Sequence, residues 1–371
     1  MIINNTLGIV FANAHDALLK DMTKTSSMAA VNYGGRYRLI DFALSNLSNG
    51  GVDKVGVITK TNYYSLMTHI GNGKPWDLDR KKGGINILPP YVSPEAQVYK
   101  GRLEAIHGIL EYLEESKEEY VVVCDSDVVA NINIRKLLAY HTQKNADITI
   151  VTAHGKKPNG QNDMMHYEFN DDGRITAVDF SPADDCEYSL DTMVIGRKLL
   201  IDIVNDEFNA GGVSLSHGIF EKCLNKYRIY GYKHQGYSAV IDSIESYFAA
   251  NLDLLNKDVR NDVFNRNNPI YTNSRDDMPA KYGLESKVTN AIIADGCIIE
   301  GTVKNSVLFR GVKVAKGAVV ENCVLMHGTE VGAGAKLNNI IADNFVKISE
   351  NNEVGCQSGV VYIEKNALIG G

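Results

Sequence analysis

The sequence lacks the features that mark two large classes of protein. Its longest apolar runs are of strand length, as at residues 120–124, whereas a membrane-spanning helix needs roughly 20 apolar residues. Its 38 basic residues are outnumbered by 45 acidic ones, for a net charge of -7. No general positive field therefore draws the chain to nucleic acid or to an anionic membrane. We expect neither as a partner, and a small molecule or another protein instead.

The cysteines show no pairing pattern either. All six are widely spaced, with no C-x-x-C pair, which favours free thiols in a reducing compartment over disulfides or a zinc site. Residues 1–5 lack the basic segment of a secretory signal. We therefore predict a cytoplasmic protein.

From residue 6 to about residue 250, strand-like apolar runs alternate with helical patterns. Residues 54–59 and 120–124 are strand-like, and residues 103–114 and 134–140 have helical spacing. This alternation predicts a mostly parallel sheet covered by helices. The last helix is expected to begin with the capping-box-like segment Asp242-Ser243-Ile244-Glu245.

The C-terminal part repeats with a period of 17 residues. Asn-Ser-Val-Leu at 305–308, Asn-Cys-Val-Leu at 322–325 and Asn-Ile-Ile-Ala at 339–342 occupy equivalent places, and apolar positions before and after them keep the same period. Short apolar pairs at a constant period are typical of a β-solenoid, in which each coil packs on the next. A hairpin-built sandwich would need no constant period.

Glycine is missing from one place where it would matter. The strand-like residues 7–11 are followed by the turn Ala-Asn-Ala-His-Asp-Ala-Leu at residues 12–18. A turn that wraps phosphates needs glycine for close backbone approach and a cation to balance charge. This turn offers neither, although the segment Gly-Gly-Arg-Tyr-Arg-Leu-Ile-Asp-Phe-Ala-Leu-Ser-Asn follows intact at residues 34–46.

Together these segments resemble the ADP-glucose pyrophosphorylase (glucose-1-phosphate adenylyltransferase) family of bacterial glycogen synthesis. The similarity runs over nearly the whole chain, and its segments are residues 34–46, 56–59, 99–101, 251–254, 269–272 and the terminal repeats. The resemblance implies an α/β fold, in which a Rossmann-like nucleotidyltransferase domain precedes a left-handed parallel β-helix domain, and a tetramer. We predict the first domain over residues 1–255, a connector over 256–284 and the β-helix over 285–371.

The resemblance also implies where the active site has been lost. The family joins glucose 1-phosphate to the α-phosphate of ATP, and it needs cations and Mg²⁺ to offset the negative charge. Its arginine in the glycine-rich loop corresponds to Leu18, and its two lysines correspond to Met28 and Ser181. Of its two metal-binding aspartates, Asp127 is present and the other is Val240. We therefore predict no catalytic residue and no bound metal in this chain.

The remaining family positions are interpreted as vestigial. Tyr99, Lys100 and Gly101 match a substrate-binding segment, as does Asp127. This pattern of loss resembles the noncatalytic GlgD-type subunits of the family, and it implies a heterotetramer with a catalytic subunit that holds the Mg²⁺.

Several residues have two interpretations. Asp125 and Asp127 are candidates for a metal site or a retained structural pair, and the missing second aspartate favours the structural pair. His15 and Asp16 form either an acid/base pair or, as we favour, part of a solvated loop. Asp242 either replaces the lost metal ligand or, as we favour, caps a helix.

The basic residues that are candidates for effector binding also have two interpretations each. Arg38 matches a position of the family's activator pocket, and both Arg36 and Arg38 face either a phosphorylated effector or an acid such as Asp41. The run Arg80, Lys81 and Lys82 is a solvated surface by default, with an anion-binding effector site as the alternative.

Three functions are compatible with these residues. The first is a regulatory subunit that tunes a catalytic homologue. The second is a weakly active adenylyltransferase that uses Lys100, Asp127 and Asp242. The third is a stand-alone sensor of a sugar phosphate or nucleotide, with self-association possible in each case.

Overall fold

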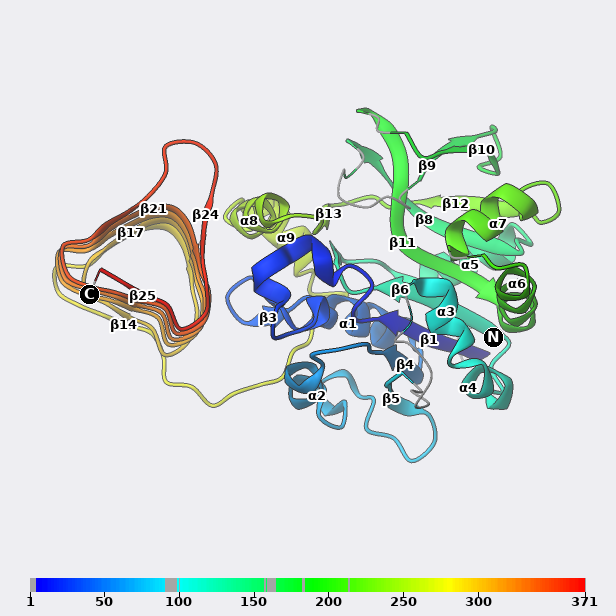
Figure 1. The fold of residues 1–371 in the computed structure, drawn as a ribbon, viewed down its shortest axis with the longest axis horizontal. Helices are drawn as coiled ribbons and strands as arrows, with labels where there is room; N and C mark the ends of the chain where they lie inside the picture. The colour runs from blue at the N-terminus through cyan, green and yellow to red at the C-terminus, as the bar shows by residue number, and fades with distance from the viewer. Residues whose placement is uncertain are drawn as a thin grey trace.

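The structure is a computed structural model, which describes residues 5–90, 99, 101–156, 158, 165–181, 184–212 and 214–370. An α/β domain and a triangular solenoid lie side by side, with helix α8 (Ile244–Asp253) against the solenoid (Figure 1). Among the described residues, no helix is both long and apolar enough to cross a membrane.

The α/β domain is built on a nine-stranded sheet whose path runs β10-β9-β11-β6-β1-β4-β5, with β8 paired to β11 and β12 paired to β8. The strands are β1 (Thr6–Phe11), β4 (Lys54–Ile58), β5 (Gly84–Leu88), β6 (Tyr120–Asp125), β8 (Ile148–Gly155), β9 (His166–Phe169), β10 (Ile175–Asp179), β11 (Cys186–Gly196) and β12 (Ile229–Lys233). Strands β5, β4, β1 and β6 are parallel, as expected, whereas β11 runs antiparallel to β6, β8 and β9. The sheet is therefore mixed, with its parallel part at the N-terminal strands.

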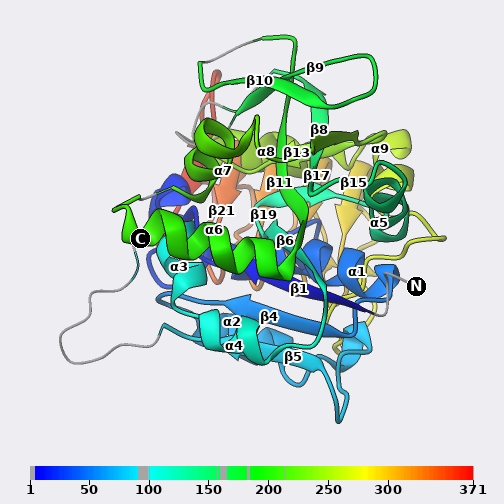
Figure 2. The same cartoon turned by 90° about the vertical axis from the view of Figure 1, so that its right-hand side faces the viewer.

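Helices cover both faces of this sheet, which explains why β1 is buried along its whole length. One face packs against α1 (Ile40–Gly50), α2 (Tyr64–Ile70) and α5 (Ile134–Gln143). The other packs against α3 (Arg102–His107), α4 (Leu110–Glu115), α6 (Arg197–Asn209) and α7 (Leu215–Cys223), which face the viewer in Figure 2. The helical pattern at residues 103–114 thus forms two short helices.

Smaller elements complete the domain. They are the 3₁₀ helices η2 (Asp16–Thr23), η3 (Met28–Ala30) and η4 (Lys74–Trp76), the strand pairs β2 (Asn32–Tyr33) with β3 (Tyr37–Arg38) and β7 (Val128–Ala130) with β13 (Ser238–Val240), and helix α9 (Lys257–Val263). Helix α9 lies inside the segment expected to be a polar connector. The predicted cap was wrong by one residue, because Ser243 and Ser246 form the capping box of α8.

The 17-residue period is confirmed as a parallel solenoid of the left-handed β-helix type. Val303, Val320 and Leu337 stand in register on neighbouring strands, and all three are buried. One sheet contains β14 (Lys281–Tyr282), β16 (Ile298–Ile299), β18 (Lys313–Val314), β20 (Glu330–Val331), β22 (Lys347–Ile348) and β25 (Leu368–Ile369). The other contains β15 (Lys287–Ile293), β17 (Thr302–Leu308), β19 (Val319–Leu325), β21 (Lys336–Ala342), β23 (Glu353–Gly355) and β24 (Val361–Ile363).

The repeated asparagines have a backbone reason. Asn305, Asn322 and Asn339 have φ of 47°, 49° and 54°, in the left-handed region that asparagine tolerates better than most residues. Each marks the same bend in successive coils, so the repeat encodes the turn as well as the core.

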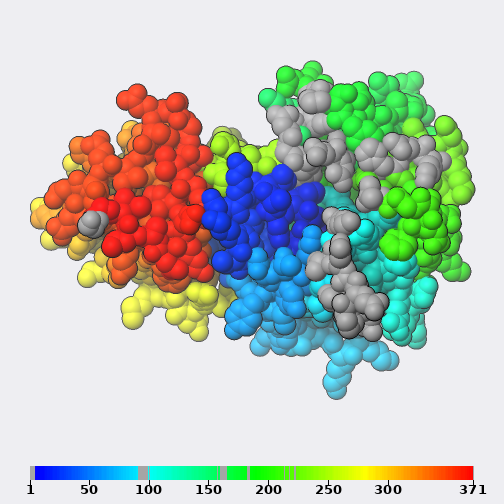
Figure 3. Space-filling model, viewed as in Figure 1, coloured from blue at the N-terminus to red at the C-terminus, as the bar shows by residue number. Residues whose placement is uncertain are grey.

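A third apolar core joins the two domains. Tyr247 of α8 packs with Tyr33 and Phe42 of the α/β domain and with Val307 and Met326 of the solenoid. The Tyr247 hydroxyl donates to the Asn32 carbonyl oxygen at 2.5 Å. Figure 3 shows the solenoid in close contact with the first residues of the α/β domain. The two domains therefore share buried side chains.

The intact segment 34–46 lies at this junction. Gly34 and Gly35 have φ of 58° and 88° in the turn between β2 and β3, and the Gly34 N–H donates to Asn251 Oδ1 at 3.0 Å. A Cβ at Gly35 would meet Ile292 Cγ2 of the solenoid at 3.4 Å. The glycines thus let this hairpin approach the solenoid closely.

His141 in α5 is expected to make the stability depend on pH. Burial lowers the pKa of its imidazole from 6.5 to about 4, against the smaller opposing effect of Asp147. Below about pH 6.5 the His141 imidazole gains a proton in the unfolded chain but stays neutral in the folded chain. The free energy of unfolding therefore decreases as the pH falls from about 6.5 to about 4. We expect a loss of up to about 3 kcal/mol in the free energy of unfolding over this interval.

Urea denaturation between about pH 7 and about pH 4.5 measures this loss. His141→Gln should flatten the pH dependence, whereas His154→Gln, at an exposed histidine, should leave it as it is. An equal slope in all three proteins would assign the effect to another group.

Candidate functional site

The candidate crevice lies at the carboxyl ends of β1 and β6, where open α/β sheets place their ligands. The segment 12–30 leaves β1 there, and Asp125, Ser126 and Asp127 leave β6. All three of the latter residues are buried. The loop that lacks glycine therefore faces the retained carboxylates directly.

His15 occupies the space next to these carboxylates. Its Nδ1 lies 2.7 Å from Asp127 Oδ2 and 3.6 Å from Asp125 Oδ2. Burial alone would lower the pKa of His15, but the charge of Asp127 and its hydrogen bond raise the pKa to about 9. The imidazole is therefore a cation at neutral pH, paired with Asp127 across 112 positions of sequence. The expectation of a solvated loop was wrong.

Asp16 closes the same loop on itself. One oxygen accepts the Met28 N–H at 2.6 Å and the other accepts the Asn13 side-chain amide at 2.5 Å. Burial raises the pKa of Asp16, against these hydrogen bonds. Asn13 Oδ1 in turn accepts the Lys60 N–H at 2.9 Å, which ties the loop to the end of β4. His15 and Asp16 do not form an acid/base pair, since each has its own partner.

Arg102 fills the neighbouring part of the crevice, and sequence reasoning missed it. Its guanidinium hydrogen-bonds Asp125 and reaches Asp191 Oδ1 at 2.9 Å. Burial raises the pKa of Asp125 to about 7, an effect that Arg102 opposes and Asp127 reinforces. The cavity beside Arg102 and Asp191 measures only about 40 Å³, which leaves room for little more than water.

The four altered family positions supply no charge to the crevice. Met28 is buried with Leu19 in the apolar core that joins the domains, and Leu18 packs against the same core. Val240 is buried on β13, and Ser181 is exposed with its hydroxyl donating to Asp179 at 2.8 Å.

The described positions that the sequence predicts to be vestigial lie around the same crevice. Tyr99 is half-buried, with the Lys60 ammonium 5.5 Å from its ring centroid. Gly101 precedes α3 as its N-cap residue, and Lys100 lies outside the described residues.

These residues do not fit the Mg²⁺ that the family resemblance implies. Mg²⁺ favours octahedral oxygen coordination and is usually held by more than one oxygen donor. Here valine stands at position 240, and an imidazole nitrogen hydrogen-bonds the remaining carboxylate, Asp127.

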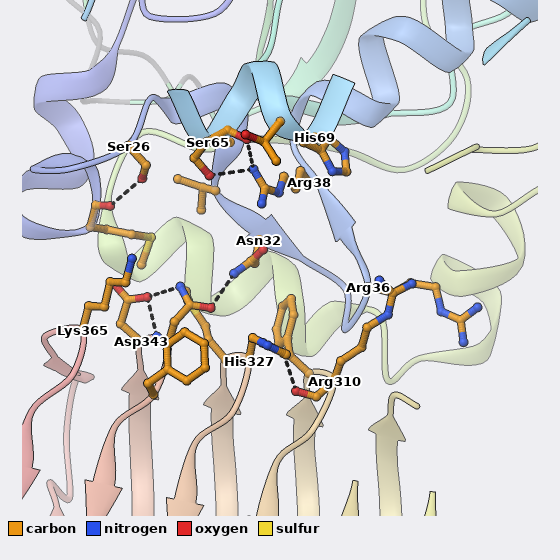
Figure 4. Close-up of a pocket in the computed structure, with 18 of the residues that line it drawn as sticks. Ser26, Asn32, Arg36, Arg38, Ser65, His69, Arg310, His327, Asp343 and Lys365 are labelled. Carbon is orange, nitrogen blue, oxygen red and sulfur yellow. Dashed lines mark hydrogen bonds between the residues drawn. The ribbon is translucent and has the colours of Figure 1, made fainter. Parts of the chain in front are cut away.

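A second candidate site is a cavity of about 400 Å³ between the two domains. In Figure 4, Arg38, Ser65 and His69 lie on the α/β wall, while Arg310, His327 and Lys365 lie on the solenoid wall. Arg36 and Arg275 also line it. Among the lining residues that the structure describes, basic side chains outnumber the one carboxylate, that of Asp343, so the cavity suits an anion.

The two predicted arginines have different environments in this cavity. Arg36 forms an ion pair with Asp295 at 3.1 Å and is exposed. Arg38 donates to the Ser65 carbonyl and hydroxyl oxygens at 2.8 and 2.9 Å, and burial lowers the pKa of its guanidinium. The Arg38 side chain thus ties β3 to α2, while Asp41 accepts only its backbone N–H.

Arg310, His327 and Lys365 were not predicted, because each stands alone in the solenoid repeats. Arg310 Nε lies 3.6 Å from Asp277 Oδ2 and is buried without a hydrogen-bond partner in the described ranges of the chain. The His327 ring donates to the Arg310 carbonyl oxygen at 2.8 Å.

The basic run at residues 80–82 does not line this cavity. Arg80 pairs with Asp77 at 2.6 Å and with Asp53 at 3.0 Å, and Lys81 and Lys82 are exposed. Its use as an effector site stays a prediction.

Comparison with known proteins agrees with this architecture. The nucleotidyl transferase family matches residues 8–180, and the GlmU-like, C-terminal hexapeptide family matches residues 278–359. The glycogen biosynthesis protein GlgD of Bacillus subtilis is 35% identical over 369 residues, which cover 99% of this chain and 98% of that protein. A glucose-1-phosphate adenylyltransferase of Clostridium botulinum is 36% identical over 327 residues, or 85% of this chain and 83% of that protein.

A glucose-1-phosphate adenylyltransferase of Thermotoga maritima is 35% identical over 324 residues, which cover 85% of this chain and 76% of that protein. Identity at this level over so much of both chains fixes a common family as well as a common fold. The chain belongs to the glucose-1-phosphate adenylyltransferase family, and over nearly its full length it is similar to a glycogen biosynthesis protein.

Proposed function

We propose that this chain is a regulatory, noncatalytic subunit that acts with a catalytic glucose-1-phosphate adenylyltransferase in glycogen biosynthesis. One observation carries the proposal: His15 and Asp16 hold the positions where a nucleotide site needs room for phosphates. His15 pairs with Asp127, and the Asp16 carboxylate takes the Met28 N–H. Bound nucleotide would have to break both interactions and displace the half-buried Asp16 carboxylate.

The cavity between the domains supports a regulatory role for the same chain. Its basic residues come from both domains, so an anion bound there contacts the α/β wall and the solenoid wall together. A sugar-phosphate effector that binds one arrangement of these walls more tightly shifts the assembly towards that arrangement. Coupling of this kind is typically worth 1 to 3 kcal/mol, or about 5- to 150-fold in affinity.

The test is an ADP-glucose assay of this chain, of a catalytic homologue and of the two mixed, with size-exclusion chromatography of the mixture. We expect co-elution, together with a raised rate or a shifted effector response of the homologue. Separate elution with unchanged kinetics would favour a stand-alone sensor, and substantial activity of this chain alone would favour an enzyme.

Loss of one cavity arginine should weaken the effector response. Arg310→Ala removes a guanidinium from the solenoid wall, and the buried Nε of that group has no hydrogen-bond partner among the described residues. Arg38→Ala removes a guanidinium from the α/β wall. A hydrogen bond to a charged group contributes about 1.5 to 3 kcal/mol, so the half-effective concentration of a sugar phosphate should rise roughly 10- to 100-fold. Activity titrations with the co-eluting mixture measure it.

Arg228→Ala is the matched control, because Arg228 lies outside the cavity and its ion pair with Asp147 is on the surface. It should change neither assembly nor effector response. If all three variants respond alike, the effector does not bind between the domains.

A further inference from the structure

We propose that the crevice of this chain binds a divalent transition-metal ion, Mn²⁺ or Zn²⁺, through His15 Nδ1 and the carboxylates of Asp125 and Asp127. This site differs from the Mg²⁺ site implied by the family, since it gains an imidazole ligand and lacks the second family aspartate. It does not depend on the proposed regulatory function.

The geometry suits a single ion. One ligand atom from each of the three residues can be chosen so that all lie within 4.8 Å of one another. His15 Nδ1 is 2.7 Å from Asp127 Oδ2 and 3.6 Å from Asp125 Oδ2. Nitrogen and oxygen ligands about 2.1 Å from one ion lie roughly 3 to 3.5 Å apart, so small side-chain shifts suffice. In the part of the chain that the structure describes, no other group of three His, Cys, Asp or Glu side chains gathers in this way.

The charge of the cluster calls for another cation. Asp125, Asp127 and Asp191 surround one guanidinium, that of Arg102, and the protonated His15 imidazole pairs with Asp127. A divalent ion that takes the place of the His15 proton adds one further positive charge to this group of three carboxylates. Asp125 is only 4% exposed, and its Oδ1 is buried with no hydrogen-bond partner among the residues described. An unpaired carboxylate oxygen in such a place is costly unless a cation reaches it.

The ligand set favours Mn²⁺ or Zn²⁺ over Mg²⁺. Imidazole with carboxylates suits Mn²⁺ and Zn²⁺, whereas Mg²⁺ favours oxygen donors alone. The lost oxygen donor belongs to position 240. Val240 pairs with Val128 on the neighbouring strand, and the Ile241 N–H donates to the Asp127 carbonyl oxygen at 2.8 Å. Valine therefore stands next to Asp127 where the family has its second metal ligand.

The experiment uses the full chain, freed of metal with a chelator and titrated separately with Mn²⁺, Zn²⁺ and Mg²⁺ by calorimetry. We expect one Mn²⁺ or Zn²⁺ per chain, bound at least about tenfold more tightly than Mg²⁺. Loss of residues that merely orient metal ligands typically lowers affinity 10- to 100-fold, so His15→Gln and Asp127→Asn should lower it by at least about tenfold.

His154→Gln is the matched control, since His154 lies on the surface 2.8 Å from Asp185 and could bind metal adventitiously. This variant should bind as the unmodified chain does. Val240→Asp should raise the affinity for Mg²⁺ relative to Mn²⁺. Pulsed electron paramagnetic resonance of the unmodified chain with Mn²⁺ should show a nitrogen coupling from the imidazole, whether or not the variants fold.

Three results would overturn the proposal: no binding of Mn²⁺ or Zn²⁺, equal binding by the unmodified chain and folded His15→Gln, or no nitrogen coupling. His15 would then be only an internal cation. Because none of these measurements involves ADP-glucose synthesis, their failure leaves the regulatory function standing.

Discussion

Purified on its own, the chain should form ADP-glucose at least about 10³-fold more slowly than an intact homologue. Loss of one charge-stabilising contact typically costs roughly 10² to 10³ in rate, and Leu18, Met28 and Ser181 stand where the family resemblance implies three cations. The losses do not simply add, because the groups act together on one transition state. The rate of ADP-glucose formation is measured at saturating ATP, glucose 1-phosphate and Mg²⁺.

Two engineered chains sharpen this expectation. The first carries Leu18→Arg, Met28→Lys, Ser181→Lys and Val240→Asp, and it should stay inactive, because His15 and Asp16 still fill the crevice. The second also replaces residues 12–18 with a glycine-rich loop, and it should recover measurable turnover if it folds. Met28→Lys places an ammonium group at a position buried in an apolar core, and burial of that charge would destabilise the fold. Thermal unfolding of both chains is therefore a necessary control.

An unmodified chain whose turnover lies within about tenfold of a typical enzyme's roughly 10 s⁻¹ would contradict the noncatalytic proposal. Activity of the first engineered chain would show instead that the loop moves aside readily.

Tyr247→Ala should cost roughly 3 to 5 kcal/mol in the free energy of unfolding, the usual range for deleting a large buried aromatic side chain. Tyr247 is fully buried in the core that α8 shares with residues between Leu19 and Phe42 and with the solenoid. Tyr247→Phe should cost about 1 kcal/mol, because it removes only the hydrogen bond to the Asn32 carbonyl oxygen. Urea denaturation with co-elution assays of each variant measures both effects.

Tyr64→Ala is the control, because Tyr64 is 83% exposed and a surface change of this kind usually stays within about 0.5 kcal/mol. If Tyr247→Ala and Tyr64→Ala unfold alike, the junction between the domains contributes little to stability.

The sequence was sufficient for the fold because its signals are local or periodic. Short alternating segments predicted the α/β domain, and the 17-residue repeat predicted the register that Val303, Val320 and Leu337 keep. The direction of strand β11 was not predicted, because its antiparallel pairing with β6 depends on residues far away in the sequence.

The crevice was less predictable for the same reason. The family resemblance predicted losses at positions 18, 28, 181 and 240, but not the contacts that His15 and Arg102 make. His15 meets Asp127 across 112 positions, and Arg102 meets Asp191 across 89. The single available signal was a histidine and an aspartate in a loop otherwise made of small or apolar residues, which is equally typical of a solvated turn.

The intact segment 34–46 and the altered loop at residues 12–18 lie in different parts of the α/β domain. The segment builds the junction with the solenoid, whereas the loop borders the crevice. A chain can therefore change its chemistry at the crevice while the junction keeps its residues, as the two sets of side chains serve different neighbours.

The shared core has a practical consequence for protein engineering. Helix α8 is matched to particular solenoid side chains, including Val307, Val324 and Ile341. A chimera that joins this α/β domain to the β-helix of a homologue would bring together surfaces that were never selected for each other. Such a chimera should fold as stably as its parents only when α8 and the hairpin at residues 32–38 are transferred together with the solenoid that they contact.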